Sequence, residues 1–187
     1  MKKWIAPVAG LGLFLVVVIG YSACKYNSMV EAEEGVDGAW AQIESNLQRR
    51  ADLIPNLVEV VKGFAAHEKE VFADVAEARS RLLGARGPAE AATANAGLSS
   101  ALGRLLAISE RYPDLKSNQN FLNLQDELAG TENRINVARI RYNDAVKSYN
   151  VTIRRFPGSV FAGMFGFEKK TFFEAEASAR DVPQVKF

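Results

Sequence analysis

This sequence has very few cysteine and histidine residues and almost no net charge. It has one cysteine and one histidine, and its 23 Lys and Arg against 22 Asp and Glu leave a formal net charge of +1. A single cysteine excludes an internal disulfide. Without paired CxxC or HExxH spacing, a conventional zinc site is not expected. The near-neutral charge gives no electrostatic reason to expect nucleic acid as a partner.

No catalytic constellation stands out either. The lone histidine, His67, has no nucleophile beside it, so a packed or half-exposed structural histidine is favoured over a catalytic base. The glycines at positions 158, 163 and 166 do not form a phosphate-binding fingerprint. We therefore predict that the protein is not an enzyme and that it has no cofactor or metal site.

Charged residues are absent from positions 4–24. As one helix, this run would span roughly 31 Å, the thickness of the hydrocarbon core of a bilayer. Lys2 and Lys3 precede the run. Lys25 follows it directly, and then come four carboxylates: Glu31, Glu33, Glu34 and Asp37. The uncharged run predicts a single-pass anchor over residues 1–25 in the inner membrane. The excess of positive charge before the run places the N-terminus in the cytoplasm and the main domain on the extracytoplasmic side.

A second interpretation of the same run is a bacterial lipoprotein signal. Residues 21–24 (YSAC) follow a basic start and an apolar stretch, as in such signals. Cys24 would then carry the lipid, and residues 1–23 would be removed. Tyr21 departs from that pattern, where an aliphatic residue is usual. We favour the plain membrane span, because the run is long enough to cross a bilayer.

Apolar residues recur at alternating spacings of three and four, a pattern typical of amphipathic helices. The first predicted helix covers residues 28–50, either beginning at the capping-box pattern of residues 28–31 or continuing from the span. Pro55 lacks a backbone N–H and is tolerated near a helix start, and Asp52 is a good N-cap ahead of it. A tight turn is therefore expected at residues 50–52, followed by a second helix over residues 53–83.

The second half of the sequence predicts two more helices. Glycines and Pro88 in residues 84–88 predict the end of the second helix and the start of a third, which runs to residue 108. Pro113 predicts a turn over residues 112–115. The fourth helix, residues 117–156, is expected to be the longest. The predicted fold is all-α: an antiparallel up-and-down four-helix bundle over residues 26–156, followed by a Phe-rich tail over residues 157–187.

Several stretches of the sequence resemble proteins of the LemA family. They are YNS at residues 26–28, AWAQ at 39–42, QRRADLIPNL at 48–57, RYPDL at 111–115, residues 118–128, RRFP at 154–157 and FGF at 165–167. The likeness covers nearly the whole chain from residue 26. It implies a bacterial, membrane-anchored, up-and-down four-helix bundle, and it implies no known reaction.

The strongest candidate site is the expected membrane-distal end of the bundle, which we call the distal corner. Arg50 falls on the apolar seam between Leu47 and Ile54, so it is predicted to point inward and to need a partner. The candidate partners are three carboxylates of the fourth predicted helix: Asp126, Glu127 and Glu132. We favour a structural polar network that fixes helix register over a partner-binding surface. The distal corner comprises Arg49, Arg50, Asp52, Pro55, Asn56, Asn118, Asn120, Asn123, Asp126 and Glu127.

The Phe-rich tail is the second candidate site. Its aromatic residues adjoin lysines, a mixture that suits an anionic membrane surface or a neighbouring subunit. The alternative is that the aromatic side chains fold back and cover the helices as ordinary core material. The candidate contact residues are Phe161, Phe165, Phe167, Lys169, Lys170, Phe172 and Phe173.

Together these patterns predict a non-enzymatic scaffold of the cell envelope, anchored in the membrane and assembling with copies of itself. The alternative is an envelope sensor or adaptor that binds another protein through the distal corner. Either function needs the membrane as a partner, and the first also needs a homo-oligomer.

Overall fold

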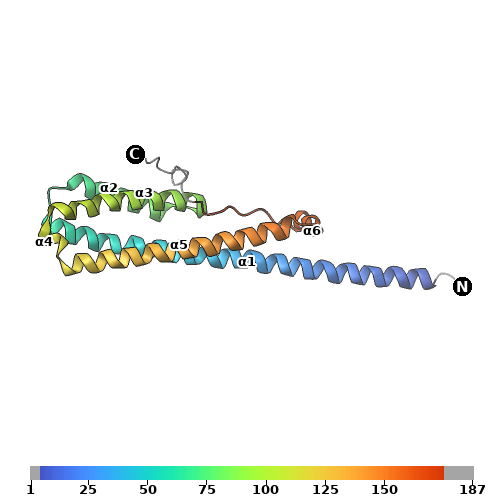
Figure 1. Ribbon diagram of the computed structural model, residues 1–187. Helices are drawn as coiled ribbons and strands as arrows, with labels where there is room; N and C mark the ends of the chain where they lie inside the picture. Colours follow the sequence, from blue (N-terminus) through green and yellow to red (C-terminus); the bar gives the residue numbers. More distant parts are fainter. Residues whose placement is uncertain (1–4, 175–187) are drawn as a thin grey trace, which may run out of the picture. The chain divides into compact units, whose positions relative to one another are not determined.

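The computed structural model describes the backbone of residues 5–174 and the side chains of residues 12 and 16–174. Within these residues the regular structure is entirely helical, which confirms the predicted all-α class (Figure 1). The elements in chain order are α1 (Ile5–Phe64), α2 (Lys69–Gly84), α3 (Gly87–Ile108), η2 (Ser109–Arg111), α4 (Pro113–Lys116), α5 (Gln119–Arg154) and α6 (Gly158–Phe165).

Helix α1 contains the uncharged run that predicts a membrane span. Among the described residues, no helix is both long and apolar enough to cross a membrane. Residue 4 and the side chains of residues 5–11 and 13–15, which form much of the predicted span, lie outside the described part.

The predicted turn at residues 50–52 is wrong, because α1 continues through Pro55 to Phe64. Proline at position 55 leaves the carbonyl of Ala51 without its usual intrahelical donor. Arg79 of α2 takes that place, since its Nε donates to the Ala51 carbonyl oxygen at 2.7 Å. A donor from another helix therefore satisfies the carbonyl group that the proline leaves open.

The actual turn lies between α1 and α2, at residues 65–68. The apolar seam gives no sign of it, because Val61, Ala65 and Phe72 are all buried and keep a near-helical spacing. The helix predicted over residues 53–83 is therefore two helices. Residues 28–31 lie inside α1, so no helix begins there, and α1 with 60 residues is longer than α5 with 36.

The later boundaries agree well with the sequence pattern. Helix α2 ends at Gly84, α3 has Pro88 in its first turn, and α5 ends at Arg154. The predicted turn over residues 112–115 is instead a short helical connection formed by η2 and α4. Asn118 caps α5, since its Oδ1 accepts the backbone N–H of Phe121 at 3.1 Å.

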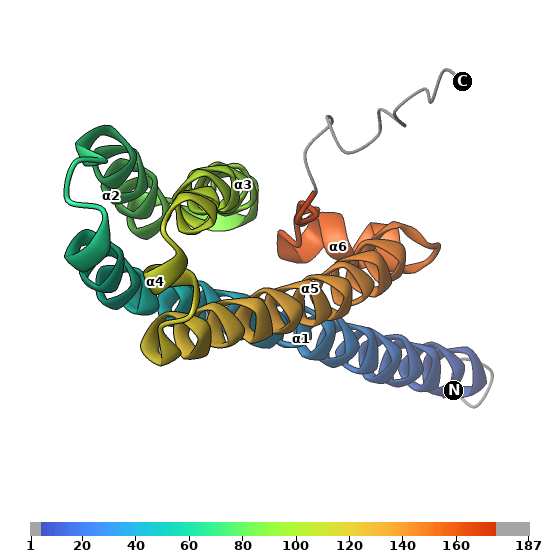
Figure 2. The same ribbon diagram turned by 60° about the vertical axis from the view of Figure 1, so that its left-hand side comes forward.

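The chain divides into two compact units. Unit 1 comprises residues 1–38 and 144–170, and unit 2 comprises residues 39–143 and 171–187. In unit 2, α2 and α3 pack on each other and lie beside the parts of α1 and α5 that belong to this unit (Figures 1 and 2). The largest side chains in its core are fully buried: Ile43, Ile54, Leu57, Leu98, Leu105, Ile108, Leu115, Phe121 and Ile135. An up-and-down four-helix bundle stays a prediction, with α1, α2, α3 and α5 as its helices.

Unit 1 has a smaller core, formed where α6 and the end of α5 pack on α1. Met29, Val36 and Tyr149 are almost fully buried in it. Gly158 begins α6 at a crowded point, where an added Cβ would meet the carbonyl oxygen of Thr152 and lie 3.2 Å from Cε of Met29. A glycine is therefore required at position 158 for α6 to pack this closely on α1 and on the end of α5.

Candidate functional site

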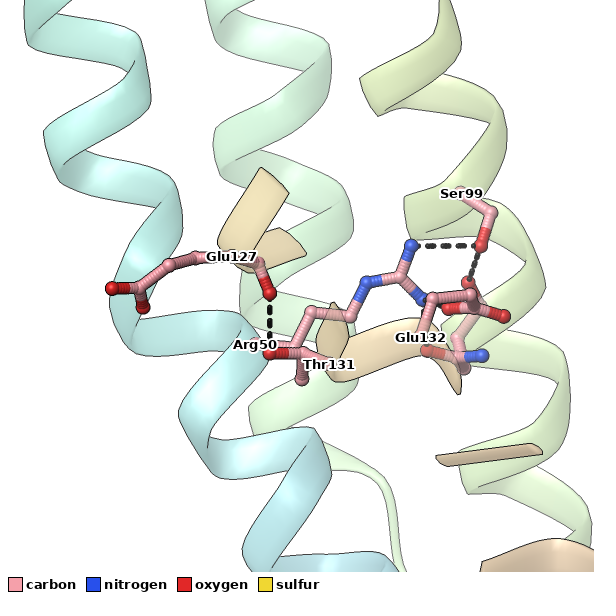
Figure 3. Close-up of polar contacts among 6 residues, drawn as sticks. Arg50, Ser99, Glu127, Thr131 and Glu132 are labelled. Carbon is pink, nitrogen blue, oxygen red and sulfur yellow. Dashed lines mark hydrogen bonds and ion pairs between the residues drawn. The ribbon is translucent and has the colours of Figure 1, made fainter. Parts of the chain in front are cut away.

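Arg50 of α1 is the centre of a buried polar network in unit 2 (Figure 3). Its Nη1 donates to Oδ1 of Asn95 at 2.6 Å, and its Nη2 donates to Oγ of Ser99 at 3.0 Å, both on α3. Nη1 also lies 2.6 Å from Oε2 of Glu132 on α5. The predicted pairing of an inward-pointing Arg50 with a carboxylate of the last long helix is thus confirmed, with Glu132 as its partner.

Burial and ion pairing shift the pKa of the Arg50 guanidinium in opposite directions. Burial lowers the pKa of Arg50, and the negative charge of Glu132 opposes that shift. Arginine nevertheless keeps its charge at neutral pH, because its ordinary pKa is far above that range. Arg50 Nε and Glu132 Oε2 find no hydrogen-bond partner among the described residues, so the Nη1–Oε2 contact is an ion pair rather than an aligned hydrogen bond.

A second, exposed ion pair lies next to this network. Nη2 of Arg49 lies 3.5 Å from Oε2 of Glu127, and the two side chains are 59% and 53% exposed. One turn further along α5, the buried Thr131 donates its hydroxyl to the Glu127 carbonyl oxygen at 2.8 Å and accepts a hydrogen bond from Arg134. Residues 49 and 50 of α1 therefore contact the same stretch of α5, one at the surface and one inside.

The remaining residues of the distal corner do not converge on one point. Asp52 accepts a hydrogen bond from Gln48 one turn earlier, and Asn123 accepts one from Gln119. Asn118 caps α5. The others are exposed: Pro55, Asn56, Asn120 and Asp126. The distal corner is thus a polar stretch along α1 and α5 rather than the turn that the sequence predicts.

Three residues that make contacts in this region were not predicted from the sequence. Asn95 and Ser99 lie on α3 and contact Arg50, and Arg79 lies on α2 and contacts the Ala51 carbonyl. Asn95 carries a usable signal, because it stands between Ala91 and Leu98 at seam spacing and is buried. A polar residue at a buried seam position needs a partner. Arg79 carries no such signal in its own helix.

The tail contacts α5 through a repeated Tyr-Asn pair. In unit 1, Tyr149 donates its hydroxyl to the Glu168 carbonyl oxygen at 2.9 Å. The Asn150 side chain bonds both backbone groups of Lys170, at 2.9 and 3.0 Å. Both α5 residues therefore bind tail backbone, and Tyr-Asn occurs again seven residues earlier, at positions 142–143.

The second Tyr-Asn pair makes the same contacts within unit 2. Tyr142 donates its hydroxyl to the Thr171 carbonyl oxygen at 2.9 Å. The Asn143 side chain bonds the carbonyl oxygen and the N–H of Phe173, at 3.1 and 2.9 Å. Tail contacts thus recur every three residues while the helix residues recur every seven.

Lys170 is also fixed through its side chain. Its Nζ lies 2.8 Å from Glu33 and 3.6 Å from Asp37, both on α1 in unit 1. The hydrogen bond to Glu33 is the main reason why the pKa of Lys170 is raised. The pKa of the nearby Tyr149 phenol is also raised, first by burial and then by the charge of Glu33.

The structure sorts the candidate residues of the tail into two groups. Phe173 is buried against Trp40, with ring centroids 6.2 Å apart, and Lys170 is paired with carboxylates. Phe173 therefore lies where the alternative of folded-back aromatic side chains expects it. The Tyr-Asn pairs hold the backbone of both residues. The remaining candidates are half-buried or exposed: Phe161, Phe165, Phe167, Lys169 and Phe172.

The two other residues with potentially reactive side chains, Cys24 and His67, lie at the surface. Cys24 is a free, exposed cysteine on α1. His67 is exposed in the turn between α1 and α2 rather than packed in the core. Across the described residues, no group of three or more histidine, cysteine or carboxylate side chains is placed to hold a metal ion.

Comparison with known proteins gives the same family as the sequence motifs. The LemA family model matches residues 39–187. Magnetosome proteins MamQ 2 and MamQ 1 of Paramagnetospirillum magneticum are each 29% identical over 199 residues, which cover 92% of this chain and 73% of the relative. Protein LemA of Metamycoplasma hominis is 23% identical over 174 residues, covering 91% and 76%. Because the family model matches most of the chain, this protein belongs to the LemA family.

Proposed function

We propose that this protein is a non-enzymatic helical scaffold of the bacterial cell envelope, anchored in the inner membrane and assembling with copies of itself. The main domain would lie on the extracytoplasmic side. Membership of the LemA family supports this proposal. Its relatives described as magnetosome proteins support a role in a cell structure rather than in a metabolic reaction.

One observation carries the anchoring part of the proposal. Val16, Val17, Val18 and Ile19 are 67%, 61%, 41% and 66% exposed. Four consecutive residues of an α-helix point in four directions, so this part of α1 is apolar on all sides. Such a surface requires apolar surroundings, and the described part of the chain does not supply them at these residues. A lipid environment around residues 4–24 would supply them.

The anchoring test uses charges placed in this run and a matched control elsewhere. Val17→Arg with Ile19→Arg should release the protein from membranes washed at alkaline pH, because a central arginine disfavours insertion by roughly 2.5–3.5 kcal/mol. Val137→Arg with Ile140→Arg changes two aliphatic residues of α5 that are 48% and 59% exposed. This control should stay membrane-bound. Retention of both variants would contradict the proposal.

The lipoprotein alternative differs in covalent structure. Intact-mass analysis of the membrane-extracted protein should give the full chain without added acyl groups. A chain beginning at a diacylated Cys24 would show that the anchor is a lipid and that residues 1–23 are a signal. The exposure of Cys24 leaves room for that modification.

Self-assembly is tested with the same full-length protein in detergent. The scaffold proposal expects its particle mass to rise with protein concentration, and cross-linking to capture pairs of identical chains. A single mass at all concentrations would contradict self-assembly while leaving the anchor intact. Imaging of the membrane-extracted particles would then give the stoichiometry.

The adaptor is the second candidate function, supported by the exposed polar side chains of the distal corner. Arg49 and Glu127 form an exposed pair there, beside the exposed Asp52 and Asp126. A protein partner from the envelope would use this surface. Arg49→Glu together with Asp126→Arg should then reduce capture of that partner by the full-length protein, whereas it should leave concentration-dependent assembly unchanged.

A further inference from the structure

Helix α6 lies beside the end of the uncharged run of α1. The rings of Phe161 and Tyr21 have centroids 6.1 Å apart, and those of Phe165 and Tyr26 have centroids 5.0 Å apart. Tyr21 belongs to the uncharged run, which ends at Cys24, and Tyr26 follows it. At 1.5 Å of rise per residue, these two tyrosines lie within roughly 5 Å of the end of the run along the helix axis.

The two faces of α6 are unusual in their composition. The small residues Gly158 and Ala162, four positions apart, are buried against unit 1. The large apolar residues Val160 and Met164, also four apart, point outward and are 54% and 69% exposed. Phe156, just before the helix, is 80% exposed. The helix therefore packs through Gly158, Ala162 and the rings of Phe161 and Phe165. It presents Val160 and Met164 to its surroundings.

Basic residues flank this outer face. Arg154 and Arg155 come just before it, and Lys169 just after it, and all three are exposed. On α1, Lys25 places its Nζ 5.5 Å from the centre of the Tyr21 ring. Glu168 is the only carboxylate between positions 151 and 170. Residues 151–170 therefore carry more basic than acidic side chains, which suits contact with negative charge.

We propose that the outer face of α6 lies in the interfacial layer of a bilayer rich in anionic lipid, next to the point where α1 leaves the membrane. Val160, Met164 and Phe156 would enter the boundary between headgroups and acyl chains, as interfacial helices do. Arg154, Arg155 and Lys169 would contact the headgroups. Tyr21 and Tyr26 stand where aromatic residues are enriched in membrane proteins, at the membrane–water interface. This inference rests on the proposed anchor of α1.

The occupant is a lipid surface rather than a second copy of the chain for two reasons. The Tyr21–Phe161 contact joins α6 to the uncharged run whose residues Val16 to Ile19 are exposed, so α6 lies next to whatever surrounds the anchor. The face carries basic flanks on both sides, and two copies meeting through it would bring like charges together.

The test places a fluorescent label on α6 in the full-length protein, held as one chain per lipid nanodisc. Cys24→Ser removes the native cysteine, and Val160→Cys or Met164→Cys supplies the labelling site. Val137→Cys on α5 is the matched control, because its side chain is 48% exposed against 54% for Val160. Lipids carrying a quencher near the headgroup should quench the two α6 labels several-fold more than the control label. Equal quenching at all three sites would overturn the proposal.

Two further measurements separate the competing explanations. If quenching at position 164 appeared only in nanodiscs that hold two chains, the face would bind a second copy and the proposal would be wrong. Replacing phosphatidylglycerol with phosphatidylcholine, or introducing Arg154→Gln with Arg155→Gln, should reduce the quenching. Quenching that is unaffected by either change would overturn the preference for anionic lipid.

The same experiment distinguishes this inference from the proposed function. A protein that fails to enter nanodiscs at all would contradict the anchor, and both proposals would fall. A protein that enters nanodiscs but has an α6 label quenched no more than the label at position 137 would retain its anchor. Only the interfacial placement of α6 would then be wrong.

Discussion

Two cationic side chains, Arg50 in unit 2 and Lys170 in unit 1, each meet a carboxylate in a different environment. The side chain of Arg50 is 6% exposed, whereas that of Lys170 is 31% exposed. Burial is the main influence on Arg50 and lowers its pKa, whereas a hydrogen bond to Glu33 is the main influence on Lys170 and raises its pKa. The same type of ion pair is therefore dominated by desolvation at one site and by attraction at the other.

The two sites also differ in what they hold together. Arg50 joins side chains of α1, α3 and α5, so its network depends on the identity of each residue. At the tail, Tyr149 and Asn150 bind backbone atoms, which every residue carries. The Arg50 network is suited to fixing which helices meet and in what register. The Tyr-Asn pairs are suited to holding an extended segment whatever its side chains are.

The largest effect is expected from removal of Arg50. Arg50→Ala should lower the free energy of unfolding by about 3 kcal/mol, the lower end of the usual cost of breaking a buried pair, because Glu132 keeps some contact with water. Arg49→Ala is the matched control one residue away and should cost less than about 1 kcal/mol, since its pair with Glu127 is exposed. Denaturant unfolding of both variants measures the difference. Similar losses for the two would show that burial does not set the cost.

The second-largest effect on stability is expected at the carbonyl group of Ala51, which Pro55 leaves without an intrahelical donor. Arg79→Ala should cost about 1–3 kcal/mol, because it leaves the Ala51 carbonyl oxygen without its donor. Pro55→Ala restores a backbone N–H at position 55, which can donate to Ala51 within the helix. In that background the cost of Arg79→Ala should fall clearly. A double-mutant cycle by thermal unfolding measures the coupling, and an additive result would contradict the proposed role of Arg79.

A smaller, local effect is expected at the tail. Asn150→Ala removes two hydrogen bonds to Lys170 and should weaken attachment of the tail by about 1–2 kcal/mol. Amide hydrogen exchange should then become faster at Lys170, while α3 keeps its protection. Asn133→Ala, at an exposed position of α5, is the control and should change neither. Faster exchange throughout the chain would indicate that the variant unfolds globally instead.

The helices and the inward position of Arg50 could be predicted because both depend on local spacing. Leu47, Arg50 and Ile54 share one face of α1 by helical periodicity alone. The effect of Pro55 could not be predicted in this way, because its compensation comes from Arg79, which lies 28 positions from Ala51 in sequence. The turn at residues 65–68 was equally hidden, since apolar spacing continues through it.

The tail contacts were missed for a different reason. The prediction considered the side chains of the tail, whereas α5 binds its backbone. The available signal lay in α5, where Tyr-Asn occurs at positions 142–143 and again at 149–150. A repeated polar pair on a buried face of a helix indicates a regularly spaced partner. In this chain the partner is an extended segment rather than another helix.

The smallest effect expected is on the pH dependence of the Lys170 site. The folded chain raises the pKa of Lys170 above its ordinary 10.5 and that of Tyr149 above 10.0. Both shifts mean that the folded protein binds protons more tightly than the unfolded chain. Their stabilisation is therefore complete below about pH 10 and is lost as the pH rises through the folded pKa values.

Thermal unfolding should show a steeper loss of stability at alkaline pH in the parent protein than in Lys170→Met, which lacks the pair with Glu33. Lys169→Met, the exposed neighbour, should behave like the parent. An identical alkaline loss in all three proteins would show that the contact with Glu33 does not contribute to stability.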